Sequence, residues 1–417
     1  MASALIRRTL AQYFQRVHVR SFSSKPASYN EPKKGDRVVI GMSGGVDSSV
    51  AARLLADQDY DLSAVFMRNW DTRDESGTDK GCEWEKDWED VQQVCKVLDL
   101  PCEMIDLSQQ YWNRVFEPSL HQWEMGITPN PDVWCNKEIK FGALLEHLPV
   151  SSSKSSKTFF ATGHYARKAW SSSFSLSRPP RPKLLRGLDP LKDQSFYLSS
   201  ISEEGLRRAL FPLGELTKKE VRELAKQYDL PTAERAESMG LCFVGEKTRF
   251  SRFISEYLPP KPGPIVDMTT GRRVSKHAGL WSFTIGENAR VGGMPQKLFV
   301  ARKDPSQNII YVVPGKDHPS LYSSGIQIQN FAWIWADTPP LPIFTEEGFR
   351  ARVKHRHRME SVLCTVRSPD KDPHGLLIEF DELEQGVAAG QVAALWDAEG
   401  DWVLGCGMIK SLSEQLD

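Results

Sequence analysis

The sequence predicts an α/β protein of three domains: an N-terminal domain on a parallel β-sheet, a small central domain and a C-terminal antiparallel β-barrel-like domain. At 417 residues the chain is too long for one ordinary domain. Strand-like runs alternate with helical spacings in the first part, which is typical of a parallel sheet. Beyond the Pro-rich segment 257–267, short apolar runs follow at close spacing, which favours antiparallel strands. We place the domains at 36–248, 249–313 and 314–417.

Residues 1–28 are expected to be a mitochondrial transit peptide. Up to Lys25 they carry five basic and no acidic side chains, with several serines, and they become amphipathic when wound as a helix. This predicts a protein of the mitochondrial matrix, the alternative being a disordered basic tail. No run of eighteen apolar residues occurs, so we expect no membrane partner. The remaining chain is mildly acidic, so a nucleic acid must be bound by local basic patches.

The elements of the N-terminal domain follow a strand-helix rhythm. We expect strands at 36–42, 61–67, 101–107 and 158–166, and helices at 47–58, 87–100 and 216–230. Ligands of open parallel sheets bind beyond the carboxyl ends of the strands, so Ser43, Met67 and Gly163 should surround one crevice. In the C-terminal half, strands are expected at 308–313, 391–396 and 402–409.

The turn SGGVDS, residues 43–48, predicts a phosphate-binding loop between the first strand and the first helix. Gly44 and Gly45 can turn successive amides toward an anion at the helix N-terminus. Ser43 and Ser48 add hydroxyl donors, and Asp47 is suited to hold Mg²⁺. The lysine of the common GxxxxGK[ST] loop is missing, which favours a departing pyrophosphate and therefore adenylation. The alternative is a tight turn that binds nothing.

Two of the seven cysteines lie in unusual surroundings, although none forms a CxxC pair or a metal-ligand spacing, so we expect no structural metal. Cys135 is expected at the start of a helix with Lys137 close by, which favours the thiolate. Cys242 stands between Gly240 and Gly245, in a segment too rich in glycine for a core helix. Taken alone, each cysteine is better explained as a small buried hydrophobe.

SGGVDS resembles the signature of the PP-loop ATP pyrophosphatases, and the chain from Arg37 onward resembles the tRNA-specific 2-thiouridylases. The resemblance spans all three predicted domains and is carried by FMRNW, TPNPDVWCNKEIKFG, ATGHYA, KDQSFYL, LCFVGE, PGPIVD and AAGQVAALW. It implies an adenine-nucleotide alpha-hydrolase-like fold for the first domain. It also implies that ATP adenylates the carbon-2 oxygen of a wobble uridine in tRNA, after which sulfur replaces that oxygen.

The resemblance implies roles for individual residues. The positions expected to bind ATP, with its Mg²⁺, are Gly41, Met42, Ser43, Gly44, Gly45, Val46, Asp47, Ser48, Met67 and Gly163. Cys242 would carry a persulfide received from an upstream sulfur donor, such as a cysteine desulfurase or a sulfur-relay protein. Cys135 would then release the product by forming a disulfide with Cys242. Asp132 would act as general acid or base on the pyrimidine.

The expected tRNA contacts come from all parts of the chain. They are Asn130, Pro131, Asp132, His164, Lys192, Asp193, Gln194, Arg356, His357 and Gln391. His357 stands where the family carries tyrosine, which still permits stacking on a base. The basic run RVKHRHR, residues 352–358, is suited to phosphate contacts; the alternative is the solvated face of a strand. The segment FTIGENARVGG lacks the Gln-Arg-Lys cluster of bacterial members, which puts an RNA contact there in doubt.

Two other functions are compatible with parts of the sequence. A PP-loop enzyme with a small-molecule acceptor would need neither Cys135 nor Cys242, and would leave RVKHRHR without a role. A non-catalytic nucleotide sensor would bind ATP but release no pyrophosphate. The intact SGGVDS turn together with both cysteines favours the thiolation of tRNA.

Overall fold

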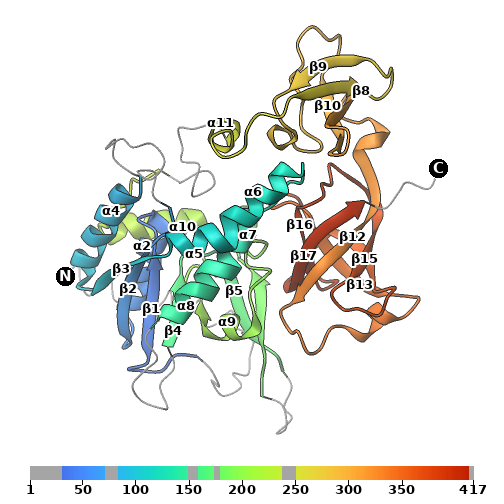
Figure 1. The fold of residues 1–417 in the computed structure, drawn as a ribbon. Coiled ribbons are helices and arrows are strands. Elements are labelled where there is room, and N and C mark those ends of the chain that lie inside the picture. The colour runs from blue at the N-terminus through green and yellow to red at the C-terminus, as the bar shows by residue number, and fades with distance from the viewer. Residues whose placement is uncertain (1–30, 71–82, 149–157, 173–178, 237–249, 413–417) are drawn as a thin grey trace.

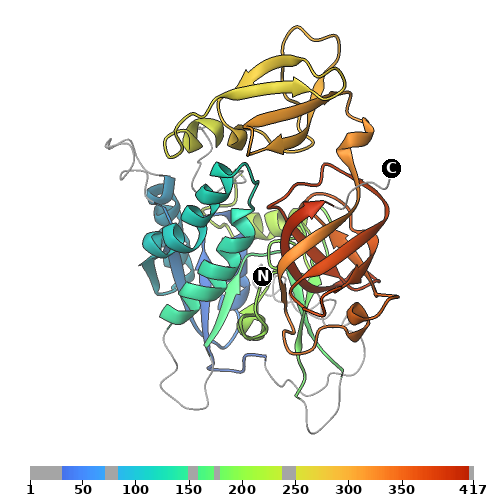
Figure 2. The same ribbon diagram turned by 45° about the vertical axis from the view of Figure 1, so that its right-hand side comes forward.

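The computed structural model describes residues 31–70, 83–148, 158–172, 179–236 and 250–412. The predicted transit peptide and Cys242 lie outside the described residues. The N-terminal domain and the C-terminal barrel lie side by side, and the central domain lies across one end of both (Figures 1 and 2). Among the described helices, none is both long enough and apolar enough to cross a membrane.

The N-terminal domain is built on a five-stranded parallel sheet, as the strand-helix rhythm predicts. The strand order is β3-β2-β1-β4-β7, with parallel pairing throughout. The strands are β1 (Arg37–Met42), β2 (Asp61–Arg68), β3 (Cys102–Asp106), β4 (Thr158–Thr162) and β7 (Ala209–Leu210). Because β1 is flanked by β2 and β4, the carboxyl ends of these three strands lie at one edge of the sheet.

Alternate residues of β1 face two separate cores, because side chains of a strand point to opposite faces. Val38 and Ile40 pack against the helices of one face, namely α2 (Val46–Ala56), α4 (Glu83–Leu98) and α10 (Lys218–Gln227). Val39 packs against those of the other face: α5 (Ser108–Tyr111), η1 (Trp112–Phe116), α6 (Glu117–Glu124), α7 (Pro131–Trp134), η2 (Cys135–Ala143) and α8 (Leu144–His147). The turns η1 and η2 are widened to π-helix, a form found mostly at functional sites.

The C-terminal domain is a closed antiparallel barrel, and the N-terminal domain contributes a hairpin to its sheet. The order β12-β15-β14-β13-β16-β17 closes through a second pairing of β12 with β17. These strands are β12 (Tyr322–Trp333), β13 (Phe349–Lys354), β14 (Val362–Arg367), β15 (Leu376–Gln385), β16 (Val392–Trp396) and β17 (Trp402–Leu412). The hairpin β5 (Ala166–Trp170) and β6 (Pro182–Arg186) joins this sheet through β17.

The hairpin corrects the single strand expected at 158–166. That segment forms β4, then turns at Gly163 and His164, and Ala166 already belongs to β5. The turn is forced by packing, because a Cβ at Gly163 would lie 2.9 Å from the amide nitrogen of Ser48. The chain therefore leaves the parallel sheet beside the N-terminus of α2.

The central domain has a sheet and a small core of its own. Its strand order is β10-β11-β8-β9, formed by β8 (Gly263–Asp267), β9 (Arg273–His277), β10 (Leu298–Asp304) and β11 (Ile309–Pro314). Its apolar core is formed by Ile265, Leu280, Ala289, Leu298, Val300, Ile310 and Val312. The preceding helix α11 (Phe250–Ile254) instead packs on the N-terminal domain, where Phe253 lies among the aromatic rings of Trp70 and Phe116.

Candidate active site

The SGGVDS turn leaves the first amides of α2 without a side-chain cap. Gly44 has a positive φ of 73°, and Gly45 is the extended N-cap residue, with no side-chain hydrogen bond to the helix. The Ser48 hydroxyl is used inside the turn: it accepts from the Ser43 amide at 3.2 Å and donates to the Gly45 carbonyl at 3.1 Å. Uncapped amides at a helix N-terminus are suited to bind a phosphate.

The two glycines of the turn serve different purposes. A Cβ at Gly44 would lie 2.7 Å from the Asp87 carbonyl oxygen, so Gly44 allows α4 to pack against the loop. A Cβ at Gly45 would meet only the Ser43 hydroxyl, at 3.5 Å, so the space beside Gly45 is open. Met42 and Val46 point their side chains into the core, so only their backbone groups are available to a nucleotide.

A lysine does reach this loop, from an element that the sequence analysis did not connect with it. Lys218, the first residue of α10, donates to both carboxylate oxygens of Asp47, at 2.7 and 2.8 Å. The hydroxyl of buried Tyr165 donates to the same carboxylate at 2.7 Å. A capping box between Thr217 and Glu220 fixes the start of α10 and so the position of Lys218. That capping box, LTKKE, was the available signal.

Arg235 attaches the end of the preceding segment to the same loop. Its guanidinium donates to the Gly44 carbonyl at 2.8 Å and forms ion pairs with Asp87 and Asp90 of α4. Arg235 lies seven residues before Cys242 in the sequence. The chain therefore enters the segment that carries Cys242 from beside the SGGVDS turn.

The expected adenine side of the site lies at the carboxyl ends of β2 and β4. Gly163 packs on the backbone of Asp47 and Ser48, so only glycine fits there. Met67, near the end of β2, is half-buried against the core. His164 is buried, and its Nδ1 lies 2.8 Å from the Thr162 hydroxyl. Burial, and secondly the charge of Lys140, hold the pKa of His164 well below its usual range, so the ring is neutral at pH 7.

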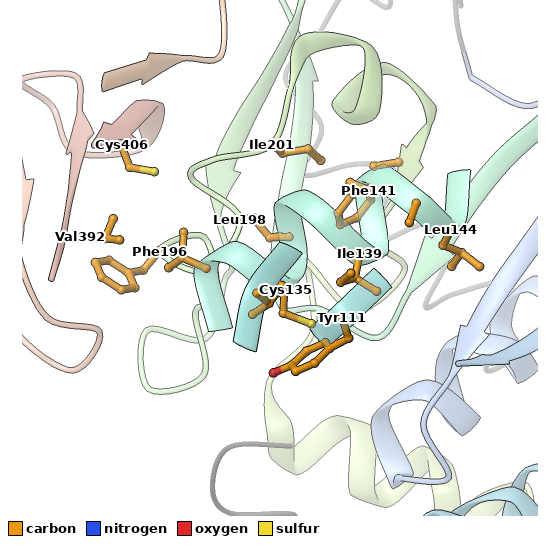
Figure 3. Close-up of a cluster of buried hydrophobic side chains, with 14 of the residues drawn as sticks. Tyr111, Cys135, Ile139, Phe141, Leu144, Phe196, Leu198, Ile201, Val392 and Cys406 are labelled. Carbon is orange, nitrogen blue, oxygen red and sulfur yellow. The ribbon is translucent and has the colours of Figure 1, made fainter. Parts of the chain in front are cut away.

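The helix that carries Asp132 and Cys135 begins at Asn130. The Asn130 side chain accepts from the Val133 amide at 3.4 Å, and Pro131 occupies the first helical position. Cys135 was expected at the helix start, but α7 precedes it and places it in the second turn, where it is only 4% exposed. Figure 3 shows its side chain beside Tyr111 and Ile139 in the apolar cluster.

Lys140, rather than Lys137, is the cation that faces the interior of the site. Lys137 is exposed, forms an ion pair with Glu138 at 3.2 Å and lies near the Trp134 ring. One helical turn further, Lys140 interacts electrostatically with both Asp132 and His164. Burial raises the pKa of Asp132, and the charge of Lys140 opposes that rise only in part. A carboxyl group with a raised pKa is suited to exchange a proton near neutral pH.

The barrel contributes two expected tRNA-contact residues to this helix. Gln391 accepts from the Asn130 side chain at 3.4 Å and donates to the Thr128 carbonyl at 3.2 Å. His357 packs on Tyr197, with 4.4 Å between the ring centroids. Tyr197 in turn lies near Asp132, and burial together with that carboxylate raises its pKa to about 12. Tyr197 is a member of this site that the sequence analysis did not single out.

The expected contact residues 192–194 divide into two kinds. Asp193 is buried and accepts hydrogen bonds from the amides of Gly187 and Ser195, both at 3.0 Å. Gln194 accepts from the Tyr165 amide at 3.0 Å. These two side chains hold the loop that follows β6, whereas Lys192 is half-buried and Arg356 is exposed. The basic character of this face therefore comes from Lys192, Arg356 and Arg358.

Three family models match consecutive parts of the chain. They are described as the tRNA methyl transferase HUP domain (residues 36–246), the tRNA methyl transferase PRC-barrel domain (251–314) and the aminomethyltransferase beta-barrel domain (323–409). The tRNA-specific 2-thiouridylase MnmA of Bacillus subtilis (strain 168) is 40% identical over 375 residues, covering 89% of this chain and 94% of the relative. That of Chromohalobacter salexigens is 39% identical over 381 residues, covering 90% and 92%. An NMN synthetase structure from Francisella tularensis aligns with a TM-score of 0.30 at 18% identity, over 51% of this chain and 69% of that one.

Proposed function

Because the chain belongs to the tRNA-specific 2-thiouridylase family, we propose that it uses ATP to convert the wobble uridine of mitochondrial tRNAs to 2-thiouridine. The enzyme is thus a tRNA-uridine 2-sulfurtransferase of the PP-loop type. The structural observation that carries the proposal is the position of Lys140. It lies near His164, which follows the nucleotide loop's contact Gly163, and near Asp132 of the base-side helix. One cation therefore connects the two halves of the site.

The first step is activation of the base. The oxygen on carbon 2 of the uridine attacks the α-phosphate of ATP, the bond to the pyrophosphate breaks, and the uridine is left adenylated at that oxygen. The uncapped amides of α2 and the open space at Gly45 support binding of the departing pyrophosphate. Asp47 is the residue that would hold Mg²⁺, which supplies charge neutralisation when bound. Lys218 and Tyr165 orient that carboxylate.

The second step transfers sulfur. The terminal sulfur of a Cys242 persulfide attacks carbon 2, and AMP leaves with the former carbonyl oxygen. The Cys135 thiolate then attacks the Cys242 sulfur, which breaks the bond to the transferred sulfur and leaves 2-thiouridine and a Cys135–Cys242 disulfide. A thiol reductant must restore both cysteines. Since Cys135 is 4% exposed, this step requires the apolar cluster around it to open toward Cys242.

Asp132 and the barrel side chains support the handling of the base. The raised pKa of Asp132 suits a proton transfer with the pyrimidine, and Lys140 stabilises its ionised form. The neutral ring of His164 can donate or accept one hydrogen bond without adding a buried charge. A wobble base must leave its stack to reach this site, and the exposed guanidiniums of Arg356 and Arg358 are placed on the barrel side to bind the RNA backbone.

The mitochondrial setting and the sulfur donor rest on the sequence. The acid-free, Arg-rich residues 1–28 support import, and the reaction needs a donor such as a cysteine desulfurase or a sulfur-relay protein. Fusion of residues 1–28 to a fluorescent protein should direct it to mitochondria. Replacement of Arg7, Arg8, Arg16 and Arg20 by glutamine should abolish that targeting, and unchanged mitochondrial localisation of the quadruple variant would contradict the assignment.

A reconstituted assay tests the reaction. The full chain is incubated with ATP, Mg²⁺, a cysteine desulfurase with cysteine, and unmodified mitochondrial tRNAs that carry a wobble uridine. Mass spectrometry of nucleosides should detect 2-thiouridine, which should disappear in Cys242→Ser and Cys135→Ser. Cys364→Ser is the matched control, because burial in the barrel raises the pKa of Cys364 to about 12 and keeps the thiol inert. Pyrophosphate release triggered by a small metabolite, without thiolation, would instead indicate a PP-loop enzyme with another acceptor.

A further inference from the structure

Lys303 of β10 points its ammonium group into the junction of the three domains. It donates to the Gly126 carbonyl oxygen at 2.8 Å and to the Thr128 hydroxyl at 3.2 Å. It makes no ion pair with any described residue; exposed Glu287 acts on it only from a distance. Burial lowers the pKa of Lys303 to about 8. A cation held in the interior by neutral acceptors is unfavourable unless it has a defined structural or functional role.

Both acceptors of Lys303 belong to the segment 126–130, which we call the junction loop. On the central-domain side, this loop is packed tightly, because a Cβ at Gly126 would lie 2.9 Å from a methyl carbon of Leu280. Gly126 itself has a positive φ of 76°. The central domain therefore contacts the loop both by a charge-assisted hydrogen bond and by an apolar contact.

The barrel contacts the opposite side of the junction loop. The Thr128 amide donates to the Ala389 carbonyl at 3.2 Å, and the Gln391 side chain donates to the Thr128 carbonyl at 3.2 Å. Gly390 packs so closely that a Cβ there would lie 2.0 Å from the Ile127 side chain. The residues between Gly126 and Thr128 are thus fixed from two domains at once.

The junction loop leads directly into the base-side helix. Its last residue, Asn130, caps that helix through the Val133 amide and is itself bound by Gln391. Asp132 lies two residues further, and Cys135 five. Because an N-cap residue fixes where a helix begins, a displacement of the junction loop moves the start of the helix that carries both side chains.

We propose that Lys303 is a positioning residue for sulfur transfer: by holding the Gly126 carbonyl and the Thr128 hydroxyl, it sets the base-side helix according to the position of the central domain. The inference rests on the proposed function and extends it to a residue outside the catalytic domain. Lys303 touches neither nucleotide loop nor base. Its effect is on the geometry of Asp132 and Cys135.

Kinetics of single variants test this role. In Lys303→Met the kcat of thiolation should fall about tenfold, since misplaced reacting groups lose rate steeply, while the KM for ATP and the Kd for tRNA stay within about twofold. Arg302→Met is the matched control: Arg302 is the preceding residue of the same strand, is exposed, and stacks on Tyr311. Its kcat should equal that of the wild type.

A second pair of variants removes the partner instead of the lysine, in case Lys303→Met folds poorly. Thr128→Val should lower kcat because it lacks the hydroxyl acceptor, and Thr128→Ser, which keeps it, should retain more activity. Amide hydrogen exchange of residues 126–130 in the absence of RNA gives a readout that does not depend on catalysis. Exchange there should be faster in Lys303→Met and Thr128→Val than in the wild type or Arg302→Met.

Three outcomes would overturn the role of Lys303. These are a wild-type kcat in Lys303→Met, a loss confined to tRNA affinity, which would make Lys303 an RNA contact, or unchanged exchange of the junction loop in both variants. A wild-type chain that forms no 2-thiouridine would refute the proposed function instead. In that case the hydrogen-exchange comparison still decides whether Lys303 holds the junction loop.

Discussion

The catalytic domain is joined to the barrel and to the central domain in two different ways. At the barrel, the joint is a backbone ladder: Leu184 and Leu185 of β6 pair with Val403 and Trp402 of β17. At the central domain, the described strands pair only among themselves, and side chains make the joint, with Lys303 as its polar contact. A backbone ladder fixes register residue by residue, whereas side-chain contacts tolerate small rotations. The barrel is therefore a rigid extension of the catalytic domain, and the central domain is the adjustable partner.

Buried ion pairs strengthen the rigid joint further. Arg181, before β6, forms hydrogen-bonded ion pairs with Glu203 of α9 and with Asp337 beyond β12, and its guanidinium lies over the Trp335 ring. Arg167 of β5 also donates to Asp401 at 2.9 Å. Partly buried networks of this kind contribute more than isolated surface pairs. No comparable ion pair links the described part of the central domain to the catalytic domain.

The largest effect is expected where the barrel meets the junction loop. Gly390→Ala places a Cβ 2.0 Å from Ile127 and 3.0 Å from the Thr128 amide nitrogen, at a φ of 88°. Because displacement of catalytic groups by about 1 Å can cost a hundredfold in rate, thiolation should fall by about that factor.

A matched variant separates this contact from backbone strain. Gly271→Ala has the same type of positive φ, 67°, but its Cβ would meet nothing within 4 Å. It should reduce stability slightly in denaturant titration and leave thiolation near the wild-type rate. Equal losses of activity in the two variants would show that strain, and not the barrel contact, is responsible.

An intermediate effect should distinguish the central joint by its pH dependence. Burial lowers the pKa of Lys303 from 10.5 to about 8, so between these values the unfolded chain binds a proton that the folded chain has lost. The free energy of unfolding of the wild type, relative to Lys303→Met, should therefore rise between pH 8 and 10.5, by about 2–3 kcal/mol in total. Below pH 8 the cost of the buried ammonium is fully present.

Urea denaturation of both proteins at pH 7 to 10 measures this difference. The Arg181→Met variant supplies the contrast at the barrel joint: its difference from the wild type should stay constant over the same range, because arginine keeps its charge throughout. A constant difference for Lys303→Met as well would mean that the ammonium is not held in the interior.

The smallest effect concerns the outer face of the barrel. Arg356 is exposed beside Gly386, so Arg356→Glu should weaken tRNA binding only a few-fold at physiological salt, and less at high salt. Lys371→Glu, an exposed residue of the same barrel, makes the same change in net charge. Filter binding at two salt concentrations compares them. Equal effects of the two variants would return residues 352–358 to a solvated strand face.

The parts of the molecule that the sequence predicts are those with contiguous signals. The parallel sheet follows from alternating apolar runs, and the SGGVDS turn from adjacent glycines between a strand and a helix. The strands expected at 308–313, 391–396 and 402–409 appear as β11, β16 and β17 with small shifts of their ends. In each case the deciding residues lie within one short window.

The parts that the sequence does not predict depend on contacts between distant residues. Lys218 reaches Asp47 across 171 positions, and Lys303 reaches Gly126 across 177. No local pattern marks either lysine, because both occur in ordinary charged or alternating stretches. Lys137 was chosen over Lys140 by closeness to Cys135 in sequence, but the helix widens to π-form there and turns Lys140 inward.

The β5–β6 hairpin also limits how this chain can be divided or recombined. It is encoded in the middle of the catalytic domain, yet it completes the edge of a sheet whose other strands come from the last hundred residues. Removal of the barrel would expose the backbone groups of β6, and such open strand edges promote aggregation. The barrel is therefore not a transferable module. A chimera that exchanges it between relatives should need the matching hairpin from the same parent to remain soluble.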